Sequence, residues 1–233
     1  MRVIVTGASK GIGRGIATYL AMEGFSVGLV ARSKDLLNDL QEAIAAQGGT
    51  CFAVTCDLRD PDETALAIAG AVDGLGGVDA LINNAGLVVR KSIFDLGVDE
   101  WRAMLETNVS GVFHATRAVL PFMKDQGFGH IINVSSISGK MPLAGGSGYA
   151  ASKFAVTGFS QSLMHEVRDF GIKVTTVFPG SVDSQSHRHD SDVDHSWKVR
   201  PEEIGQVCRD VLRSGPGTVI SEVEVRPLRR PPK

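Results

Sequence analysis

Short apolar strands alternate with helical stretches along almost the whole chain, and this alternation constrains the fold more than any other feature. Helical patterns cover about residues 13–22, 34–47, 61–75, 100–122, 149–170 and 201–213. The strands lie around them, at Val3–Val5, Ser26–Val30, Cys51–Thr55, Val78–Ile82, His130–Val134, Lys173–Phe178 and Thr218–Val225. Strands and helices in this order form a parallel sheet with right-handed crossovers. The sequence therefore predicts a doubly wound α/β fold with seven parallel strands and helices on both faces.

The length and the near-zero net charge of the chain are typical of one ordinary globular domain. The 233 residues include 24 basic and 26 acidic ones, a net charge of −2, so we expect neither nucleic acid nor a membrane surface as a partner. No apolar run approaches the ~18 residues of a membrane span, and a strand starting at Val3 leaves no room for a signal peptide. The three cysteines form no CxxC pair, which is typical of a reduced, cytoplasmic protein. We expect a single domain over 1–233, with a polar loop at 184–198 and a tail at 226–233.

A glycine-rich turn joins the first strand to the first helix. Gly7, Gly11 and Gly13 have the spacing G-x-x-x-G-x-G. Backbone N–H groups at the start of such a helix can bind a pyrophosphate, and glycines let the backbone approach it closely. The alternative is a plain turn with three glycines. The strand before it and the helix after it favour a dinucleotide site.

Tyr149 and Lys153 lie four residues apart in a helical pattern. Side chains at this spacing are neighbours on one helix face. A phenol titrates near pH ~10, and a neighbouring ammonium favours the phenolate and lowers that pKa. The pair therefore predicts an acid/base group that works near neutral pH. The alternative is an exposed tyrosine and lysine without a chemical role.

Several short motifs together resemble the short-chain dehydrogenase/reductase family. They occur in the family's order and spacing, as Thr6-Gly7-x-x-x-Gly11-x-Gly13, Asp57, Asn83-Asn84-Ala85-Gly86, Asn108, Ser136, Tyr149-x-x-x-Lys153 and Pro179-Gly180. The resemblance covers residues 1 to about 182. It implies a Rossmann-like fold and an NADP-type oxidoreductase that interconverts a carbonyl compound and a secondary alcohol by hydride transfer.

The resemblance also implies a role for each of four catalytic residues. Tyr149 is the general acid for reduction, or the base for oxidation. Lys153 lowers the Tyr149 pKa and hydrogen-bonds the nicotinamide ribose. Ser136 holds the substrate oxygen, although the sequence alone leaves open an exchange of roles with Ser135. Asn108 holds a water that links Lys153 to solvent.

The same resemblance implies a set of cofactor-binding residues. Asp57 and Leu58 flank the adenine, and Pro179, Gly180 and Val182 meet the carboxamide end of the nicotinamide. The full set is Gly7, Ser9, Lys10, Gly11, Ile12, Gly13, Arg32, Asp57, Leu58, Asn84, Ala85, Gly86, Tyr149, Lys153, Pro179, Gly180 and Val182.

The end of the second strand predicts a preference for NADP(H) over NAD(H). An NAD site usually has an acid here, which binds the ribose hydroxyls and repels a 2′-phosphate. This chain has Ala31 and then Arg32, whose planar fork of donors suits phosphate. Lys10 in the glycine turn can reach the same phosphate, and basic residues there accompany NADP in relatives. The alternative is that both cations are solvated surface residues.

The loop at 184–198 contains three histidines and three aspartates, so a metal site is conceivable. His187, His189 and Asp190 are close in sequence, but no rigid element fixes them and the family chemistry uses no metal. We therefore expect no metal, and a loop that forms part of the substrate lid.

Other functions remain open at this stage. A 3-oxoacyl-carrier reductase is one alternative, weakened by the short Pro/Arg tail, and a catalytically silent cofactor-sensing regulator on the same fold is another. An epimerase of the extended branch would need a longer C-terminal region. We expect a small-molecule carbonyl or alcohol substrate, and a homotetramer or homodimer that pairs the Asn108 and Tyr149 helices. The broad apolar face of the Tyr149 helix supports this assembly.

Overall fold

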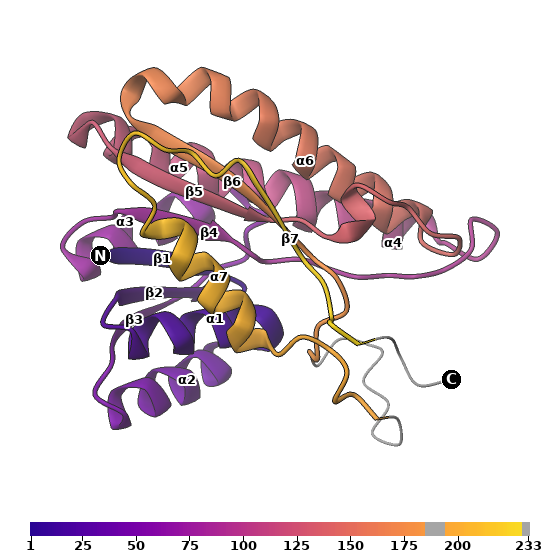
Figure 1. Cartoon of the computed structure of the whole chain (residues 1–233), viewed down its shortest axis with the longest axis horizontal. Helices are drawn as coiled ribbons and strands as arrows, with labels where there is room; N and C mark the ends of the chain where they lie inside the picture. The colour runs from indigo at the N-terminus through magenta and orange to yellow at the C-terminus, as the bar shows by residue number, and fades with distance from the viewer. Residues whose placement is uncertain (185–193, 230–233) are drawn as a thin grey trace.

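The computed structural model describes residues 1–184 and 194–229 and contains one seven-stranded sheet. All neighbouring strands are parallel, and their order is β3-β2-β1-β4-β5-β6-β7 (Figure 1). The strands are β1 (Arg2–Thr6), β2 (Ser26–Ala31), β3 (Thr50–Thr55), β4 (Ala80–Asn83), β5 (Gly129–Val134), β6 (Ile172–Pro179) and β7 (Glu222–Val225). The predicted doubly wound α/β fold is confirmed.

The helices follow the predicted pattern, with one difference in a helix and another in the last strand. They are α1 (Gly11–Met22), α2 (Lys34–Ala46), α3 (Pro61–Leu75), α4 (Val98–Leu105), the π-helix η1 (Glu106–Ser110), α5 (Gly111–Gln126), the 3₁₀ helix η2 (Ile137–Gly139), α6 (Ser147–Val167), the 3₁₀ turn η3 (Arg168–Phe170) and α7 (Pro201–Leu212). The predicted helix over 100–122 is thus three segments, with a π-helix between two α-helices. The last strand begins at Glu222 rather than Thr218, and the segment before it is held to β6 by the Thr175 hydroxyl, which donates to the Ile220 carbonyl at 2.6 Å.

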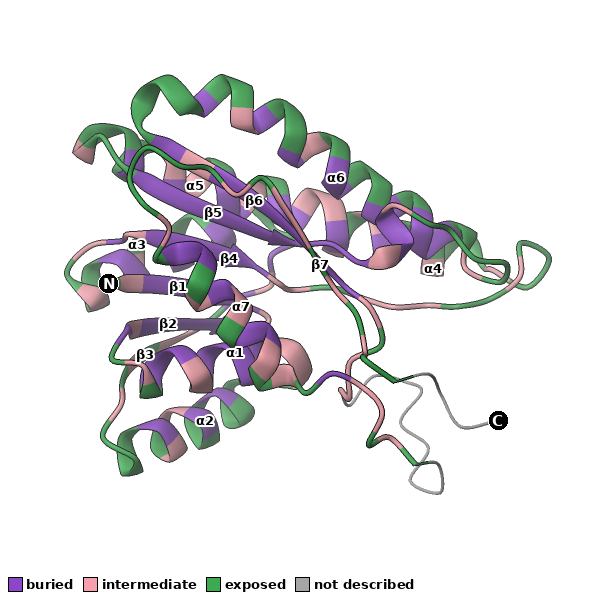
Figure 2. Ribbon diagram, in the orientation of Figure 1, coloured by how far each residue is buried: buried purple, intermediate pink, exposed green. Residues whose placement is uncertain are grey.

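The side chains of the central strands alternate between two buried clusters. Val3 and Val5 pack with α1, α2 and α7 on one face, whereas Ile4 packs with α3, α5 and α6 on the other. This is the period of a strand, in which successive side chains point to opposite faces. Figure 2 shows buried strands between helices whose outer sides are exposed. A parallel sheet covered on both faces explains why its strands are continuously apolar.

The strand order reverses at β1, and a crevice is expected at this point of an open α/β sheet. β1 pairs with β2 on one side and with β4 on the other. The turns after β1 and β4 leave the carboxyl edge of the sheet together, and ligands bind at such points in open α/β sheets. The Thr6 hydroxyl ties the two turns, because it accepts the backbone N–H of Asn84 at 3.1 Å and of Ala85 at 3.2 Å.

Two predicted features fall mainly outside the described residues. The substrate-lid loop at 184–198 includes residues 185–193, and the tail at 226–233 includes 230–233. The lid and its histidines His187 and His189 therefore stay predictions. Within 1–184 and 194–229, no helix is both long and apolar enough to cross a membrane.

Candidate active site

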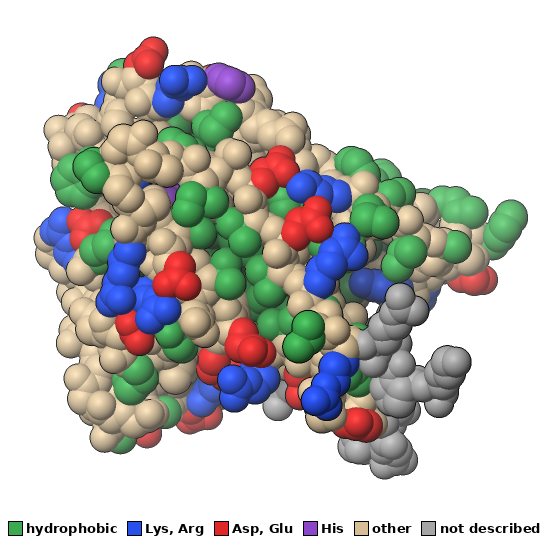
Figure 3. Space-filling view, in the orientation of Figure 1, with side chains coloured by type: hydrophobic (Ala, Val, Ile, Leu, Met, Phe, Trp, Pro, Cys, Tyr) green, Lys and Arg blue, Asp and Glu red, His purple; other side chains and the backbone are tan. Residues whose placement is uncertain are grey.

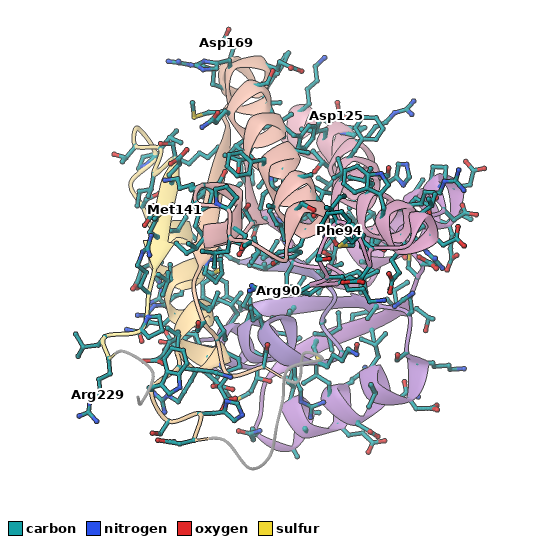
Figure 4. All side chains as sticks on the ribbon, turned by 90° about the vertical axis from the view of Figure 1, so that its right-hand side faces the viewer. Arg90, Phe94, Asp125, Met141, Asp169 and Arg229 are labelled. Atoms are coloured by element: carbon teal, nitrogen blue, oxygen red, sulfur yellow. The ribbon has the colours of Figure 1, made fainter. Side chains whose placement is uncertain are left out.

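A cleft of about 430 Å³ lies at the carboxyl edge of the sheet. Figure 4 looks toward this edge, with Arg90 near the middle between α6 above and the N-terminal half of the chain below. Most of the predicted cofactor-binding residues line the cleft, namely Gly7, Ser9, Lys10, Gly11, Ile12, Arg32, Asp57, Leu58, Asn84, Ala85, Gly86, Tyr149 and Lys153. Residues far apart in sequence are therefore gathered around one cavity, as the motifs predicted.

The glycines of the first turn allow close packing that no other residue permits. Gly7 has φ +66°, and a Cβ there would lie 2.7 Å from the Ala85 Cα. A Cβ on Gly13 would collide with the Gly7 carbonyl and the Asn84 amide. Gly13 itself does not line the cleft, so its role is to pack α1 against the turns. The resulting cradle of backbone at the start of α1 fits a pyrophosphate group.

The ends of β2 and β3 carry charged side chains into the cleft. Arg32 lines it next to Ala31, and Lys10 lies on the opposing glycine turn. Asp57 lines it too, and its carboxylate binds the Arg59 guanidinium at 2.6 Å. These hydrogen bonds from Arg59 hold the pKa of Asp57 below its usual range, against the opposing effect of burial.

Tyr149 lies at the cleft wall with only 8% of its surface exposed. Ser136 interacts with its hydroxyl, and the Arg90 guanidinium carbon lies 5.6 Å from its ring centre. Burial nevertheless raises the pKa of Tyr149, while Ser136 and Arg90 lower it by less. The net shift is upward because the cost of burying the phenolate outweighs these two contributions. The expected lowering by Lys153 stays a prediction.

Lys153 is buried and points at the backbone of β5. Its ammonium donates to the Val134 carbonyl at 2.9 Å, and its nitrogen lies 5.9 Å from the Tyr149 ring centre. Burial lowers the pKa of Lys153 to about 8. The two side chains are neighbours, as their spacing predicted, but the ammonium donates its hydrogen bond to the backbone of β5 rather than to the phenol.

The two adjacent serines have different partners. The Ser135 hydroxyl donates to the Lys153 carbonyl at 3.1 Å and contacts the Thr157 hydroxyl at 3.3 Å. Ser136 instead interacts with Tyr149, and its hydroxyl accepts the Ser138 backbone N–H at 3.1 Å. Ser135 is thus committed to α6, while Ser136 is positioned beside the phenol. Ser135 lines the cleft and Ser136 does not, but the contact with the phenol favours Ser136 as the substrate-facing serine.

Asn108 lies fully buried in the π-helix η1. Its amide nitrogen donates to the Leu87 carbonyl and the Ser152 hydroxyl, each at 2.9 Å, and its oxygen accepts the Leu87 N–H at 2.6 Å. The side chain therefore fastens the segment after β4 to α6. A Cβ added to Gly86 would lie 3.4 Å from the Asn108 oxygen and 3.7 Å from the Lys153 nitrogen. Asn108 is thus close to Lys153, although it does not line the cleft.

The predicted residues at the end of β6 do not line the cleft. The Gly180 N–H donates to the Val225 carbonyl at 2.7 Å, Pro179 pairs with Val225 in the sheet, and Val182 forms a bridge with Val199. These contacts fasten the end of β6 to β7 and to the segment before α7. Their expected contact with the nicotinamide stays a prediction.

Sequence reasoning missed several residues that line the cleft. They are Ser33, Cys56, Arg59, Ala103, Thr107 and Val134. Leu87 and Val88 also line it, from the segment 87–94 that was expected to face the substrate, and Ser184 lines it from the expected lid loop. Ala31 and Ser135 were discussed without being assigned to the site. Most of them flank a predicted residue, so their neighbourhood was a usable signal. Ala103 and Thr107 reach the cleft from α4 and η1; Thr107 precedes the predicted residue Asn108, whereas no motif marks Ala103.

Apolar side chains are exposed in the segments 93–94 and 141–143. Ile93, Phe94, Met141 and Leu143 are all more than half exposed. Figure 4 labels Phe94 and Met141 on the same face of the molecule as Arg90, and Figure 3 shows hydrophobic side chains gathered toward that end, on its right. Lys91 is paired with Glu100 at 2.6 Å. These observations are in keeping with an apolar substrate wall.

In the described ranges, no cluster of three or more histidine, cysteine or acidic side chains is suited to a metal ion. His187 and His189 lie outside those ranges, so the expected absence of a metal in their loop is not tested.

Known proteins resemble this chain over nearly its full length. The family described as short chain dehydrogenase matches residues 1–194. An uncharacterized oxidoreductase of Staphylococcus aureus is 35% identical over 225 residues, covering 97% of this chain and 96% of its own. Among solved structures, an alcohol dehydrogenase of the archaeon Thermococcus sibiricus, complexed with 5-hydroxy-NADP, is 26% identical with a TM-score of 0.91 and covers 100% of this chain and 98% of its own. A variant of actinorhodin polyketide ketoreductase with NADPH is 30% identical with a TM-score of 0.89, covering 97% and 95%.

Proposed function

This chain belongs to the short-chain dehydrogenase family and is an oxidoreductase of that family, and from this premise we propose its reaction. It interconverts a carbonyl compound and a secondary alcohol by hydride transfer, with NADP(H) preferred over NAD(H). The observation that carries the proposal is the position of Tyr149 and Lys153 at the wall of a cleft that Lys10 and Arg32 also line, with Ser136 in contact with the phenol.

The site residues support a proton transfer at the substrate oxygen. Tyr149 donates its hydroxyl proton to that oxygen in reduction and accepts it in oxidation. Ser136 donates a hydrogen bond to the same oxygen as negative charge develops there, which stabilises the transition state. Lys153 supplies a nearby positive charge. Asn108 holds the segment after β4 against α6, next to Lys153. The nicotinamide cofactor supplies the hydride, and the protein fixes distance, face and charge.

The cleft is suited to a dinucleotide. The close-packed glycines leave backbone N–H groups for the pyrophosphate, and the ends of β2 and β3 offer a place for the adenosine. Ala31 puts no carboxylate at the ribose, and Arg32 and Lys10 offer cationic donors for a 2′-phosphate. The solved relatives named above were found with NADP-type cofactors, which supports the same preference.

A panel of ketones, aldehydes and secondary alcohols, followed by nicotinamide absorbance with both cofactors, tests the proposal. We expect turnover with at least one carbonyl substrate and a higher kcat/KM with NADPH than with NADH. Cofactor binding without any turnover across the panel would instead support a cofactor-sensing regulator. Higher kcat/KM with NADH would contradict the cofactor preference.

A 3-oxoacyl-carrier reductase is the second candidate. The similarity to a polyketide ketoreductase favours it over other acyl substrates. The panel therefore includes one 3-oxoacyl group both as a simple thioester and bound to a carrier protein. A much higher kcat/KM for the carrier-bound form would identify this activity, whereas equal values favour a free small-molecule substrate.

We further propose that the enzyme is a homodimer or homotetramer built on α5 and α6. Ala151, Phe154, Ala155 and Gly158 form an exposed small and apolar face along α6. Phe113 on α5 is 45% exposed and contacts Phe159 edge to face, with ring centres 6.5 Å apart. An apolar face of this extent is typical of an interaction surface.

A further inference from the structure

The turn after β3 holds an ion pair inside the cleft. The Asp57 carboxylate accepts hydrogen bonds from Arg59 Nε at 3.1 and 3.0 Å, from Nη2 at 2.6 Å and from the Arg59 backbone N–H at 3.1 Å. Both residues line the cleft. A single arginine, two positions along the chain, therefore engages both oxygens of the carboxylate.

This ion pair faces the same part of the cleft as Arg32. The register of β2 and β3 pairs Ala31 with Thr55, and the Cys56 N–H donates to the Ala31 carbonyl at 2.9 Å. After Arg59, Arg32 is a further cation that lowers the pKa of Asp57. The ends of the two strands thus place Asp57 within electrostatic reach of the residue proposed to bind the 2′-phosphate.

Stability gives little reason for the pair. The side chains of Arg59 and Asp57 are 43% and 28% exposed, and ion pairs this exposed contribute little to folding. The turn is also held without Arg59, because the Asp57 N–H donates to the Glu63 carboxylate at 2.9 Å and Asp60 caps the start of α3. The position of the arginine is better explained by its effect on the cleft.

An unpaired Asp57 carboxylate would oppose a 2′-phosphate. Its negative charge would repel the phosphate, in the same way that an Asp or Glu at the end of β2 repels it in NAD sites. We propose that Arg59 is a positioning residue for NADP(H) selection, which holds Asp57, cancels its charge and so lets Arg32 and Lys10 bind the 2′-phosphate. This inference rests on the proposed preference for NADP(H).

Two nucleotide fragments test it without any turnover. ADP-ribose and 2′-phospho-ADP-ribose differ only in the phosphate, and calorimetry gives the affinity of each. In Arg59→Gln we expect the affinity for the phosphorylated fragment to fall about tenfold, and that for ADP-ribose to change by less than about threefold. Arg59→Lys keeps the positive charge but loses the two-pronged guanidinium. Its affinity for the phosphorylated fragment is expected to lie between those of the wild type and Arg59→Gln.

A second substitution separates charge cancellation from direct binding. In the double variant Asp57→Asn with Arg59→Gln, the carboxylate charge is gone, so the ratio of the two affinities is expected to return to within about threefold of wild type. A ratio that stays low in the double variant would mean that Arg59 binds the phosphate itself, and would overturn the positioning role.

A matched control and the wild type distinguish the two possible failures. Arg102 is exposed and paired with Asp99 at 3.8 Å, so Arg102→Gln removes the same charge outside the cleft and is expected to leave the ratio unchanged. Equal binding of both fragments by the wild type would refute the NADP(H) preference. A wild-type preference that Arg59→Gln leaves intact would refute only the role of Arg59.

Discussion

The guanidinium of Arg90 lies over the ring of Tyr149, with its central carbon 5.6 Å from the ring centre. Lys153 is the cation that motif reasoning pairs with this tyrosine, yet its nitrogen is no closer, at 5.9 Å, and donates to the Val134 carbonyl. Arg90 is the cation that acts against the burial of Tyr149, which raises its pKa. The segment after β4 therefore contributes to the acid/base group as well as to the cleft wall.

Replacing Arg90 by Met is expected to raise the pKa of Tyr149 further. Alcohol oxidation needs the phenolate as base, so its rate rises as pH passes through that pKa. Loss of the nearby positive charge disfavours the phenolate and moves the rise to higher pH. The pH profile of kcat/KM for oxidation measures the shift.

Lys91→Met is the matched control for Arg90→Met. It removes one positive charge from the neighbouring position, where Lys91 is paired with Glu100 at 2.6 Å. We expect the pH profile of this variant to match that of the wild type. An equal shift in both variants would point to a general charge effect rather than to the contact between Arg90 and Tyr149.

Tyr149→Phe is expected to lower kcat by about 10²-fold or more, because only the proton-donating hydroxyl is lost. Cofactor affinity is expected to change little, since the ring that lines the cleft remains. Steady-state kinetics and a cofactor titration together check this. Retention of more than a few per cent of activity would show that another group is the acid.

Much of the fold could be predicted because its strands are buried on both faces. The alternation of Val3 and Val5 with Ile4 between two cores requires an apolar run, and such runs are visible in sequence. The glycine turn was equally readable, because the contacts at Gly7 and Gly13 tolerate no side chain. The positions of these glycines were therefore visible in the sequence, whereas their binding of a pyrophosphate stays a prediction.

The features that were missed depend on tertiary structure. The π-helix around Asn108 shifts the helix register by about one residue, roughly 100°. Ala103 lines the cleft from α4 and Thr107 lines it from this π-helix. The pKa of Tyr149 depends on how deeply it is buried, which spacing along a helix does not reveal. The ion pair between Arg59 and Asp57 depends on the backbone path of the turn after β3.

Ala31→Asp combined with Arg32→Ala is expected to shift the preference from NADP(H) toward NAD(H). The new carboxylate can accept the ribose hydroxyls, and it repels a 2′-phosphate that has also lost a cationic donor. The ratio of kcat/KM with NADPH to that with NADH measures the change. An unchanged ratio would show that these two cleft residues do not read the phosphate.

Phe154→Glu is expected to convert the proposed oligomer to smaller species. Phe154 is 44% exposed on the apolar face of α6, and a buried carboxylate at an interface is costly. Light scattering at micromolar concentration measures the mass. Leu66→Glu on α3, where the leucine is 76% exposed, is the control and is expected to leave the mass unchanged. A monomeric wild type would contradict the proposed assembly.

Stability is expected to fall as pH is lowered from about 6.5 toward 4, because of His130. Burial lowers the pKa of His130 to about 4, and the ring nitrogen Nε2 lies 2.8 Å from the Thr175 hydroxyl. That hydroxyl donates to the Ile220 carbonyl, so Nε2 is the donor to Thr175 and the other ring nitrogen carries no proton in the neutral form. Lys173 nearby opposes a second positive charge.

The sign follows from proton uptake. Between these two pH values the unfolded chain has a protonated His130 and the folded chain does not, so acid favours unfolding by up to the order of 3 kcal/mol. The folded chain keeps its full stability above the unfolded pKa of His130 and loses up to this amount as the pH falls toward the folded pKa of about 4. Thermal melting from pH 4 to 8 measures it. His130→Asn is expected to be less stable at pH 7 but to show a shallower fall in Tm below pH 6.5, and an equally steep fall would assign the acid sensitivity to other groups.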